Sequence, residues 1–311
     1  MKEIPDYSAL ALPQILSSLT KRSSALRPGE EIGFLILDPD HCPGYYAGEK
    51  ILLDSREFVC RSWRSWNDLA TQLGFRMLTP RPWDRQRLLL RFSKLNQTGF
   101  HQECYNKEKY GLQSQFSRIT KEEEPSFLHS YTQALRRVNI AGRARILDLG
   151  IHRGDELEPI RRLAGDAFER IQIIGVDRCA EALEAARRRF SENLKTYRYD
   201  INALNELDLG RFDLILSIGT LQSPGIEMKP LIMYLVQNHL SPGGALLLGW
   251  PNSRWIDGEL IYGAKAPHYP FSELSLVIKD LHWIKKYLQQ HRFRVVITGR
   301  EYLFLEATSI G

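Results

Sequence analysis

One stretch of the sequence decides the fold: RILDLGIHRGDEL, residues 145–157. An apolar strand ends in an acid, Asp148, the chain then passes through a loop with two glycines, and a helix follows. In an open α/β sheet, a nucleotide-like ligand binds outside the carboxyl end of such a strand. Gly150 is expected to allow a tight turn beneath the ligand, and Gly154 a helix start close to the sheet. Taken alone, the loop is also consistent with an ordinary strand-to-helix turn.

Two later predicted strands also end in acids. The stretch IIGV, residues 173–176, leads to Asp177, and the next strand leads to Asp200 and Ile201. A carboxylate at the first position can accept both ribose hydroxyl protons, and one at the second can accept from an adenine amino group while Ile201 packs on the ring. Each acid, taken singly, also suits a helix N-cap or a turn. Together they predict an adenosine-binding edge built from three neighbouring strands.

From Ser126 onward, short apolar stretches alternate with amphipathic ones, which is typical of a largely parallel sheet covered on both faces. The predicted strands are residues 145–149, 171–176, 196–199, 212–217, 244–249, 293–298 and 302–307. The predicted helices are residues 127–138, 155–164, 179–190, 228–239 and 273–291. The gap between the last two strands is too short for a crossover helix, so these strands must form an antiparallel hairpin. The predicted fold class is α/β, with a seven-stranded, mostly parallel sheet, helices on both faces and a C-terminal hairpin.

In this order, the motifs resemble those of the class I (Rossmann-like) S-adenosylmethionine-dependent methyltransferases. The matching positions are Asp148-x-Gly150-x-x-x-Gly154 for the first motif, Asp177 for the ribose-binding acid, Asp200 for the adenine-contacting acid and Pro242-Gly243-Gly244 for the turn before the fifth strand. The resemblance implies S-adenosylmethionine as cofactor, with its methionine end near Asp148 and Gly150 beneath it. The implied cofactor-binding residues are Asp148, Gly150, His152, Gly154, Asp177, Arg178, Asp200, Ile201 and Ser217.

His152 departs from the family pattern, which usually has a second glycine at this position, so its side chain must point away from the ligand or line the pocket. An NAD-type dehydrogenase is the alternative enzyme, because its ribose acid lies at a similar distance. Its pyrophosphate needs closely approaching amides from a GxGxxG loop, whereas here Glu156 and Glu158 bring negative charge to the helix start. A sulfonium cation tolerates such acids. The dehydrogenase hypothesis also gives no reason for the terminal hairpin.

The N-terminal part has a different pattern and predicts a small α+β domain over residues 1–95. Its expected elements are a helical arm within residues 1–27, strands at 32–37, 50–53 and 87–92, and a helix from Trp63 that ends before Gly74. Residues 96–125 are polar and weakly periodic, and we interpret them as a linker or cap. Residues 126–311 are the predicted methyltransferase domain. The N-terminal domain and the linker are expected to shape the acceptor or partner side.

The composition is that of a globular protein, with 43% hydrophobic and 25% charged residues. The apolar runs are shorter than the roughly 18 residues of a bilayer span, and the N-terminus MKEIPDYSALALPQIL has acids and prolines where a secretory signal has basic residues. We therefore expect a cytoplasmic protein without a membrane partner. The four cysteines are scattered, which argues against structural zinc and a disulfide framework. The segment from Asp38 to Cys42 is interpreted as a turn rather than a metal site.

Methyl transfer from a sulfonium is an in-line displacement with an activated leaving group, so no fixed catalytic residue is required. Where the acceptor needs a base, His268, Tyr269 and Glu301 are the candidates, because they lie on segments expected near the strand ends. Each is also the kind of residue found in a surface or packing role. Residues 218–223, IGTLQS, lack the Asn/Asp-Pro-Pro-aromatic pattern of amino-methylating nucleic-acid enzymes.

Residues 61–95 hold eight basic residues against two acids, which favours an RNA acceptor because cations neutralise phosphates and aromatic rings stack on bases. Against RNA, Trp63 and Trp66 occur at core spacing with Leu69 and Leu73, so most of these rings are expected to be buried. We predict a methyltransferase that acts on a small-molecule acceptor. The alternatives are an RNA methyltransferase and a non-catalytic module that binds the cofactor or a partner. The sequence carries no signal for the oligomeric state.

Overall fold

The computed structural model describes residues 4–96, 120–256, 259–261 and 274–310. The chain divides into two compact units, residues 1–103 with 255–261 and residues 104–254 with 262–311. Each unit has its own hydrophobic core and is described by itself. In the described part of the chain, no helix is both long enough and apolar enough to cross a bilayer.

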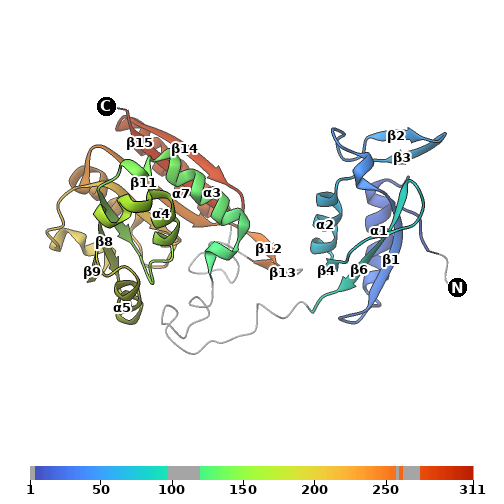
Figure 1. Ribbon diagram of the computed structural model, residues 1–311, viewed down its shortest axis with the longest axis horizontal. Coiled ribbons are helices and arrows are strands. Elements are labelled where there is room, and N and C mark those ends of the chain that lie inside the picture. Colours follow the sequence, from blue (N-terminus) through green and yellow to red (C-terminus); the bar gives the residue numbers. More distant parts are fainter. Residues whose placement is uncertain (1–3, 97–119, 257–258, 262–273, 311) are drawn as a thin grey trace. The chain divides into compact units, whose positions relative to one another are not determined.

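The smaller unit is an antiparallel sheet packed against two helices (Figure 1). Its elements are α1 (Leu12–Ser23), β1 (Glu31–Leu37), a 3₁₀ turn (Pro39–His41), β2 (Lys50–Leu53), β3 (Arg56–Val59), α2 (Trp63–Gln72), β4 (Phe75–Met77), β5 (Arg81–Pro82) and β6 (Arg87–Lys94). β6 pairs with β1, β4 and β5, while β2 and β3 form a separate hairpin. Ile15 and Leu19 of α1 and Trp66 of α2 bury their side chains against Phe34 and Phe92 of the sheet. Trp66 is therefore a core residue, whereas Trp63 is only half-buried.

The larger unit is built on a seven-stranded sheet in the order β14-β15-β11-β10-β7-β8-β9. Its strands are β7 (Arg145–Leu149), β8 (Gln172–Asp177), β9 (Leu194–Arg198), β10 (Phe212–Ile218), β11 (Leu240–Pro251), β14 (Phe293–Gly299) and β15 (Tyr302–Ser309). The five strands from β9 to β11 pair in parallel. β15 pairs antiparallel with both β11 and β14. The mostly parallel sheet predicted from the sequence is confirmed.

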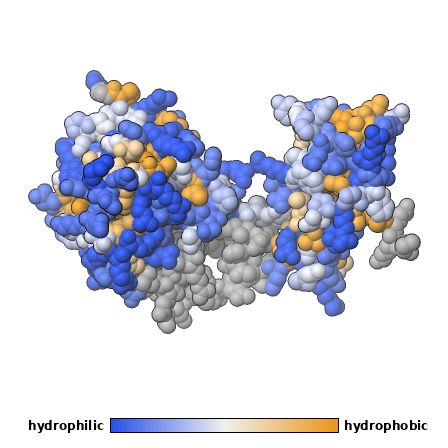
Figure 2. All heavy atoms as spheres, viewed as in Figure 1, coloured by the Kyte–Doolittle hydropathy of each residue, from blue (hydrophilic) through white to orange (hydrophobic). Residues whose placement is uncertain are grey.

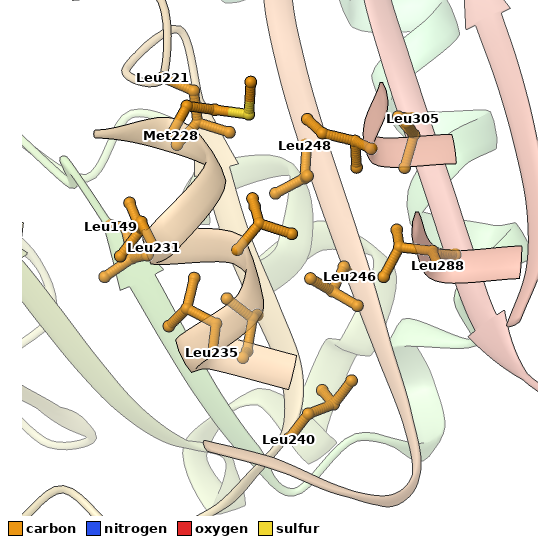
Figure 3. Packing of buried hydrophobic residues seen from close by; sticks show 14 of the residues in the cluster. Leu149, Leu221, Met228, Leu231, Leu235, Leu240, Leu246, Leu248, Leu288 and Leu305 are labelled. Carbon is orange, nitrogen blue, oxygen red and sulfur yellow. The ribbon is translucent and has the colours of Figure 1, made fainter. Parts of the chain in front are cut away.

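Helices cover both faces of this sheet (Figure 1). On one face lie α3 (Pro125–Arg137), α4 (Leu157–Ala164) and α5 (Ala180–Arg189). On the other lie α6 (Met228–Tyr234), which continues as a π-helical segment (Leu235–His239), and α7 (Leu274–Gln290). Figure 3 shows Leu246 and Leu248 of β11 between Leu231 of α6 and Leu288 of α7. Ala245 and Leu247, which point to the opposite face, are buried in the other core cluster, so both faces of β11 are covered, as is typical of parallel sheets.

Short elements complete the larger unit. They are 3₁₀ turns at Lys121–Glu123, Ile140–Gly142, Gly165–Arg170 and Ile201–Glu206. A small hairpin of β12 (Arg254–Ile256) and β13 (Glu259–Ile261) consists mostly of residues 255–261, which group with the smaller unit. β12 and β13 were not predicted, and neither were β3, β4 and β5 in the smaller unit. The predicted helix 228–239 is helical over its whole length, but the hydrogen bonds of its second half are π-helical. β11 begins at Leu240, before the predicted start at 244, because Leu240 pairs with Phe212 and the regular ladder resumes at Ala245.

Candidate cofactor and active site

The carboxyl ends of the parallel strands lie at one edge of the sheet, and the acids predicted from the sequence follow those ends. Asp148 pairs in register with Gly175 of β8 and Leu216 of β10. Asp177 is the last residue of β8, and Asp200 follows β9 by two residues. Because neighbouring parallel strands end at the same edge, the three acids lie along it in the order in which their strands are paired.

Asp148 is the most unusual residue of this edge. Its side chain is fully buried, and among the described residues neither carboxylate oxygen has a hydrogen-bond partner. Burial raises the pKa of Asp148 well above its usual value, nearby Glu156 raises it further, and the Lys121 ammonium acts in the opposite direction. A buried acid without a partner is costly, so such a group calls for a ligand.

Glu156 is the second buried acid, at the start of α4, with a residue exposure of 7%. Burial raises its pKa to about 7, against the opposing effect of Lys121. The backbone carbonyl of Glu156 accepts a hydrogen bond from the buried Tyr131 hydroxyl at 3.1 Å. The sequence identified Glu156 only as negative charge at a helix start. Its burial arises from the way α3 and α4 pack, which no local pattern signals.

Lys121 was not predicted as a site residue. It opens the 3₁₀ turn before α3, in the stretch interpreted as a linker, and its Nζ donates to the carbonyl oxygen of Ile218 at 3.3 Å. The ammonium lies 5.9 Å from the ring centre of Tyr302. Tyr302 is buried, and in the described part of the chain its hydroxyl has no hydrogen-bond partner. Lys121 therefore belongs to the same edge as Asp148, although it precedes the domain in sequence.

The loop after β7 has the tight turns expected of its glycines. Gly150 has φ +78°, and a Cβ added there would lie 2.1 Å from Oγ1 of Thr220. Gly154 has φ +71°, and a Cβ there would lie 3.1 Å from the Phe190 ring. Neither position accepts a larger residue without strain.

His152 stands where the resembling family has glycine, and it takes the same kind of backbone conformation, with φ +48°. Its amide donates to Oδ2 of Asp177 at 3.0 Å, which helps to hold the left-handed turn. The side chain is half-buried. The departure from glycine thus leaves the loop shape intact, at the small energetic cost of a side chain in the left-handed region.

Asp177 is fixed by backbone donors at both oxygens. Oδ2 accepts from His152 and Oδ1 accepts from the amide of Cys179 at 2.8 Å. An ionised carboxylate has about four lone-pair positions, so each oxygen retains room for a further donor such as a ribose hydroxyl.

Asp200 lies beside a shallow hollow of about 410 Å³, lined by Arg178, Arg198, Tyr199, Asp200 and Ala203. It caps the following 3₁₀ turn by accepting from the Asn202 amide, and it forms an ion pair with Arg178. The hydrogen bond from the backbone amide of Asn202 lowers the pKa of Asp200, and the Arg178 guanidinium lowers it further. The pair is exposed and therefore weak, so a ligand can displace it at little cost. Ile201 is buried and belongs to the core beneath.

Of the remaining predicted site residues, two are described by the structure and two are not. Ser217 is fully buried, and its hydroxyl donates to the carbonyl of Leu149 at 3.2 Å, between adjacent strands. Glu301 lies in the turn before β15 and pairs with Arg300 at 2.6 Å. His268 and Tyr269 lie outside the described residues. Within the described residues, no cluster of His, Cys, Asp and Glu is arranged to hold a metal ion.

Comparison with known proteins agrees with this geometry. Residues 141–291 match a family described as a methyltransferase domain. No curated protein matches the sequence. Similar solved structures include an O-methyltransferase family protein from Burkholderia thailandensis, with 15% identity over 65% of this chain and 64% of that chain and a TM-score of 0.40. A second is the N-methyltransferase NodS from Bradyrhizobium japonicum WM9 in complex with S-adenosyl-L-homocysteine, with 20% identity over 60% of this chain and 89% of that chain and a TM-score of 0.41. A third is the Burkholderia thailandensis 1,6-didemethyltoxoflavin-N1-methyltransferase, with 18% identity over 65% of this chain and 84% of that chain and a TM-score of 0.42.

The chain spans just under two thirds of the first of these proteins, and likenesses at this level of identity and TM-score carry no conclusion about the acceptor. The family match identifies a methyltransferase domain over residues 141–291, which include the five parallel strands of the sheet. The cofactor that the resemblance of the sequence motifs implies is S-adenosylmethionine.

The residues of this edge fit that cofactor. Its methionine end carries an ammonium and a sulfonium, and Asp148 offers a buried carboxylate whose oxygens have no partner among the described residues. Its ribose carries two hydroxyls, and the fixed carboxylate of Asp177 has acceptor positions to spare. The hollow beside Asp200 is open to an adenine ring.

Proposed function

We propose that the chain methylates a small-molecule acceptor, with the cofactor held along the carboxyl edge of β7, β8 and β9. The observation that carries the proposal is the buried, unpartnered carboxylate of Asp148 directly before the Gly150 turn. In this arrangement, Asp148 faces the methionine end, the turn at Gly150 and Gly154 lets the backbone approach, and Asp177 accepts from the ribose hydroxyls. The cofactor would supply a methyl group on a positively charged sulfur.

The adenine end is assigned to Asp200, Ile201 and Arg178. Release of Arg178 from its exposed ion pair frees Asp200 to accept from the adenine amino group. His152 contributes its amide, which orients the Asp177 carboxylate. Ser217 supports the site indirectly, by tying β10 to the end of β7 through Leu149.

The protein's contribution to the reaction is alignment and exclusion of water, since the leaving group is activated by its own charge. For an acceptor that must lose a proton, Glu301 is the described candidate base, because the turn before β15 lies at the carboxyl edge of β11. His268 and Tyr269 remain candidates as well. Residues 1–95 and 96–125 are the proposed acceptor or partner modules.

The small-molecule assignment is supported by the burial and the ion pairs of several arginines in the basic stretch 61–95. Arg61 is buried, Arg87 pairs with two acids and Arg91 with one, all within the smaller unit. Trp66 is buried and unable to stack on a base. On the face shown in Figure 2, this unit has hydrophobic patches beside hydrophilic ones. The stretch keeps part of its positive charge on three exposed arginines, Arg76, Arg81 and Arg85. What weighs against an RNA acceptor is the burial of Arg61 and Trp66 and the ion pairs of Arg87 and Arg91.

The test is transfer of a labelled methyl group to cell extract separated into small-molecule, RNA and protein fractions. We expect the label in the small-molecule fraction, and none with Asp177→Ala, which removes the ribose acceptor. Label in the RNA fraction would replace the proposed acceptor class. Failure of the full chain to bind S-adenosylhomocysteine in a calorimetric titration would contradict the cofactor site itself.

A further inference from the structure

Two buried acids and one cation meet at the carboxyl edge of the sheet. Asp148 and Glu156 are both buried, and the Lys121 ammonium lowers the pKa of each against the effect of burial. Other groups that face this cluster include Asp155, Asp177 and the phenols of Tyr131 and Tyr302. The effect of Lys121 on both acids is electrostatic and acts through space, since no ion pair of Lys121 within 4.0 Å is found among the described residues.

The ammonium of Lys121 is positioned by the end of β10. It donates to the carbonyl oxygen of Ile218, and it lies 3.3 Å from the point that a Cβ on Gly219 would occupy. The Tyr302 hydroxyl lies 2.5 Å from that same point. An ammonium has three donors, and Ile218 takes one of them. Lys121 therefore has donors to offer to an anionic group at the carboxyl end of β10.

The cofactor's methionine end is a zwitterion, with an ammonium and a carboxylate on the same carbon. A site for it needs a negative and a positive group at short range, and an unpaired charge of either sign is penalised. Asp148 supplies the negative group. A site with only acids would leave the cofactor's carboxylate facing Asp148, Glu156 and Asp177 without compensation.

We propose that Lys121 binds the carboxylate of the cofactor's methionine end, while Asp148 faces its ammonium. The inference rests on the proposed function, because it assumes that this edge holds S-adenosylmethionine. Lys121 is thereby a cofactor-positioning residue contributed by the segment before the methyltransferase domain. It lies outside residues 141–291, which match the methyltransferase family.

The experiment compares two ligands that differ only in the carboxylate. S-adenosylmethionine and its decarboxylated form, which retains the ammonium and the sulfonium, are titrated into the full chain by calorimetry. For Lys121→Met, we expect S-adenosylmethionine to bind about 10-fold to 100-fold more weakly, the value of a lost charge-assisted hydrogen bond. The decarboxylated ligand should bind as tightly as before or more tightly, because a positive charge has been removed from beside a cationic ligand.

Two further variants complete the design. Lys121→Arg should restore most of the affinity for S-adenosylmethionine, because a guanidinium also binds a carboxylate. Lys286→Met, at an exposed position of α7, should change neither affinity. Undiminished binding of the decarboxylated ligand to Lys121→Met also shows that the variant is folded.

The outcomes separate this inference from the proposed function. An equal change of both affinities in Lys121→Met, in either direction, would make Lys121 a counter-ion of the buried acids and overturn the inference while the cofactor site stands. An unchanged affinity for S-adenosylmethionine would also overturn it. If the unsubstituted chain bound neither ligand, the proposed function would fall and the inference with it.

Discussion

At the scale of single residues, the buried acid Glu156 makes stability depend on pH. Its pKa is raised by burial to about 7 in the folded chain, from 4.5 for the exposed group. An acid with a raised folded pKa binds its proton more tightly in the native state, so its contribution is fully present below pH 4.5 and is lost as pH rises through about 7. A shift of this size corresponds to a loss on the order of 3 kcal/mol.

Glu156→Gln removes this titration. We therefore expect the unsubstituted chain to lose about 2.5 kcal/mol relative to the variant between pH 5 and pH 8. The measurement is denaturant-dependent hydrogen exchange of β7 and β10 amides, which reports on the larger unit alone. Glu158→Gln, on the same helix but ion-paired at the surface, is the matched control and should keep the pH dependence of the unsubstituted chain. Equal pH profiles for Glu156→Gln and the unsubstituted chain would contradict the buried-acid explanation.

At the scale of elements, one ion pair attaches the edge hairpin to α3. Arg137 Nε lies 2.6 Å from Oε2 of Glu306, Arg137 Nη2 lies 2.9 Å from Oε1, and the Thr298 hydroxyl also donates to Oε1. Glu306 is only 3% exposed, whereas Arg137 is partly exposed. Removal of the arginine would leave a buried carboxylate with little compensation.

For Arg137→Met we expect a loss of about 2 kcal/mol, less than for a fully buried pair because solvent reaches the guanidinium. The double variant with Glu306→Met should be more stable than Arg137→Met alone, since the uncompensated charge is gone. Hydrogen exchange of β15 amides in denaturant measures both. Additive losses in the double variant would show that the pair is not coupled.

The elements also show how far sequence reasoning reaches. β7, β8 and β10 are apolar runs that end in an acid or a serine, so their positions and their parallel pairing follow from pattern alone. β12 and β13 have three residues each, too few to show a period. Lys121 lies in a polar stretch before Pro125, and only the fold brings it to the end of β10. The sequence therefore predicts the residues on the strands, whereas the cation and the second buried acid depend on tertiary packing.

At the scale of the whole molecule, cofactor binding is expected to stabilise one unit. All residues proposed to hold the cofactor lie in the larger unit, and each unit has a separate core. At a concentration of S-adenosylhomocysteine 100 times its dissociation constant, binding adds about 2.7 kcal/mol to the free energy of unfolding of the unit that binds it.

Hydrogen exchange on the full chain resolves this prediction by peptide. Amides of β7, β8 and β10 should exchange more slowly by a factor of about 100 in the presence of S-adenosylhomocysteine, where exchange requires unfolding of the larger unit. Amides of β1 and β6 should exchange at an unchanged rate, because their hydrogen bonds belong to the other sheet. Asp177→Ala is the control, since it should abolish the protection at the same ligand concentration. Protection of β1 and β6 equal to that of β7 would mean that the two cores unfold together, and the smaller unit would then have to be treated as part of the cofactor-binding structure.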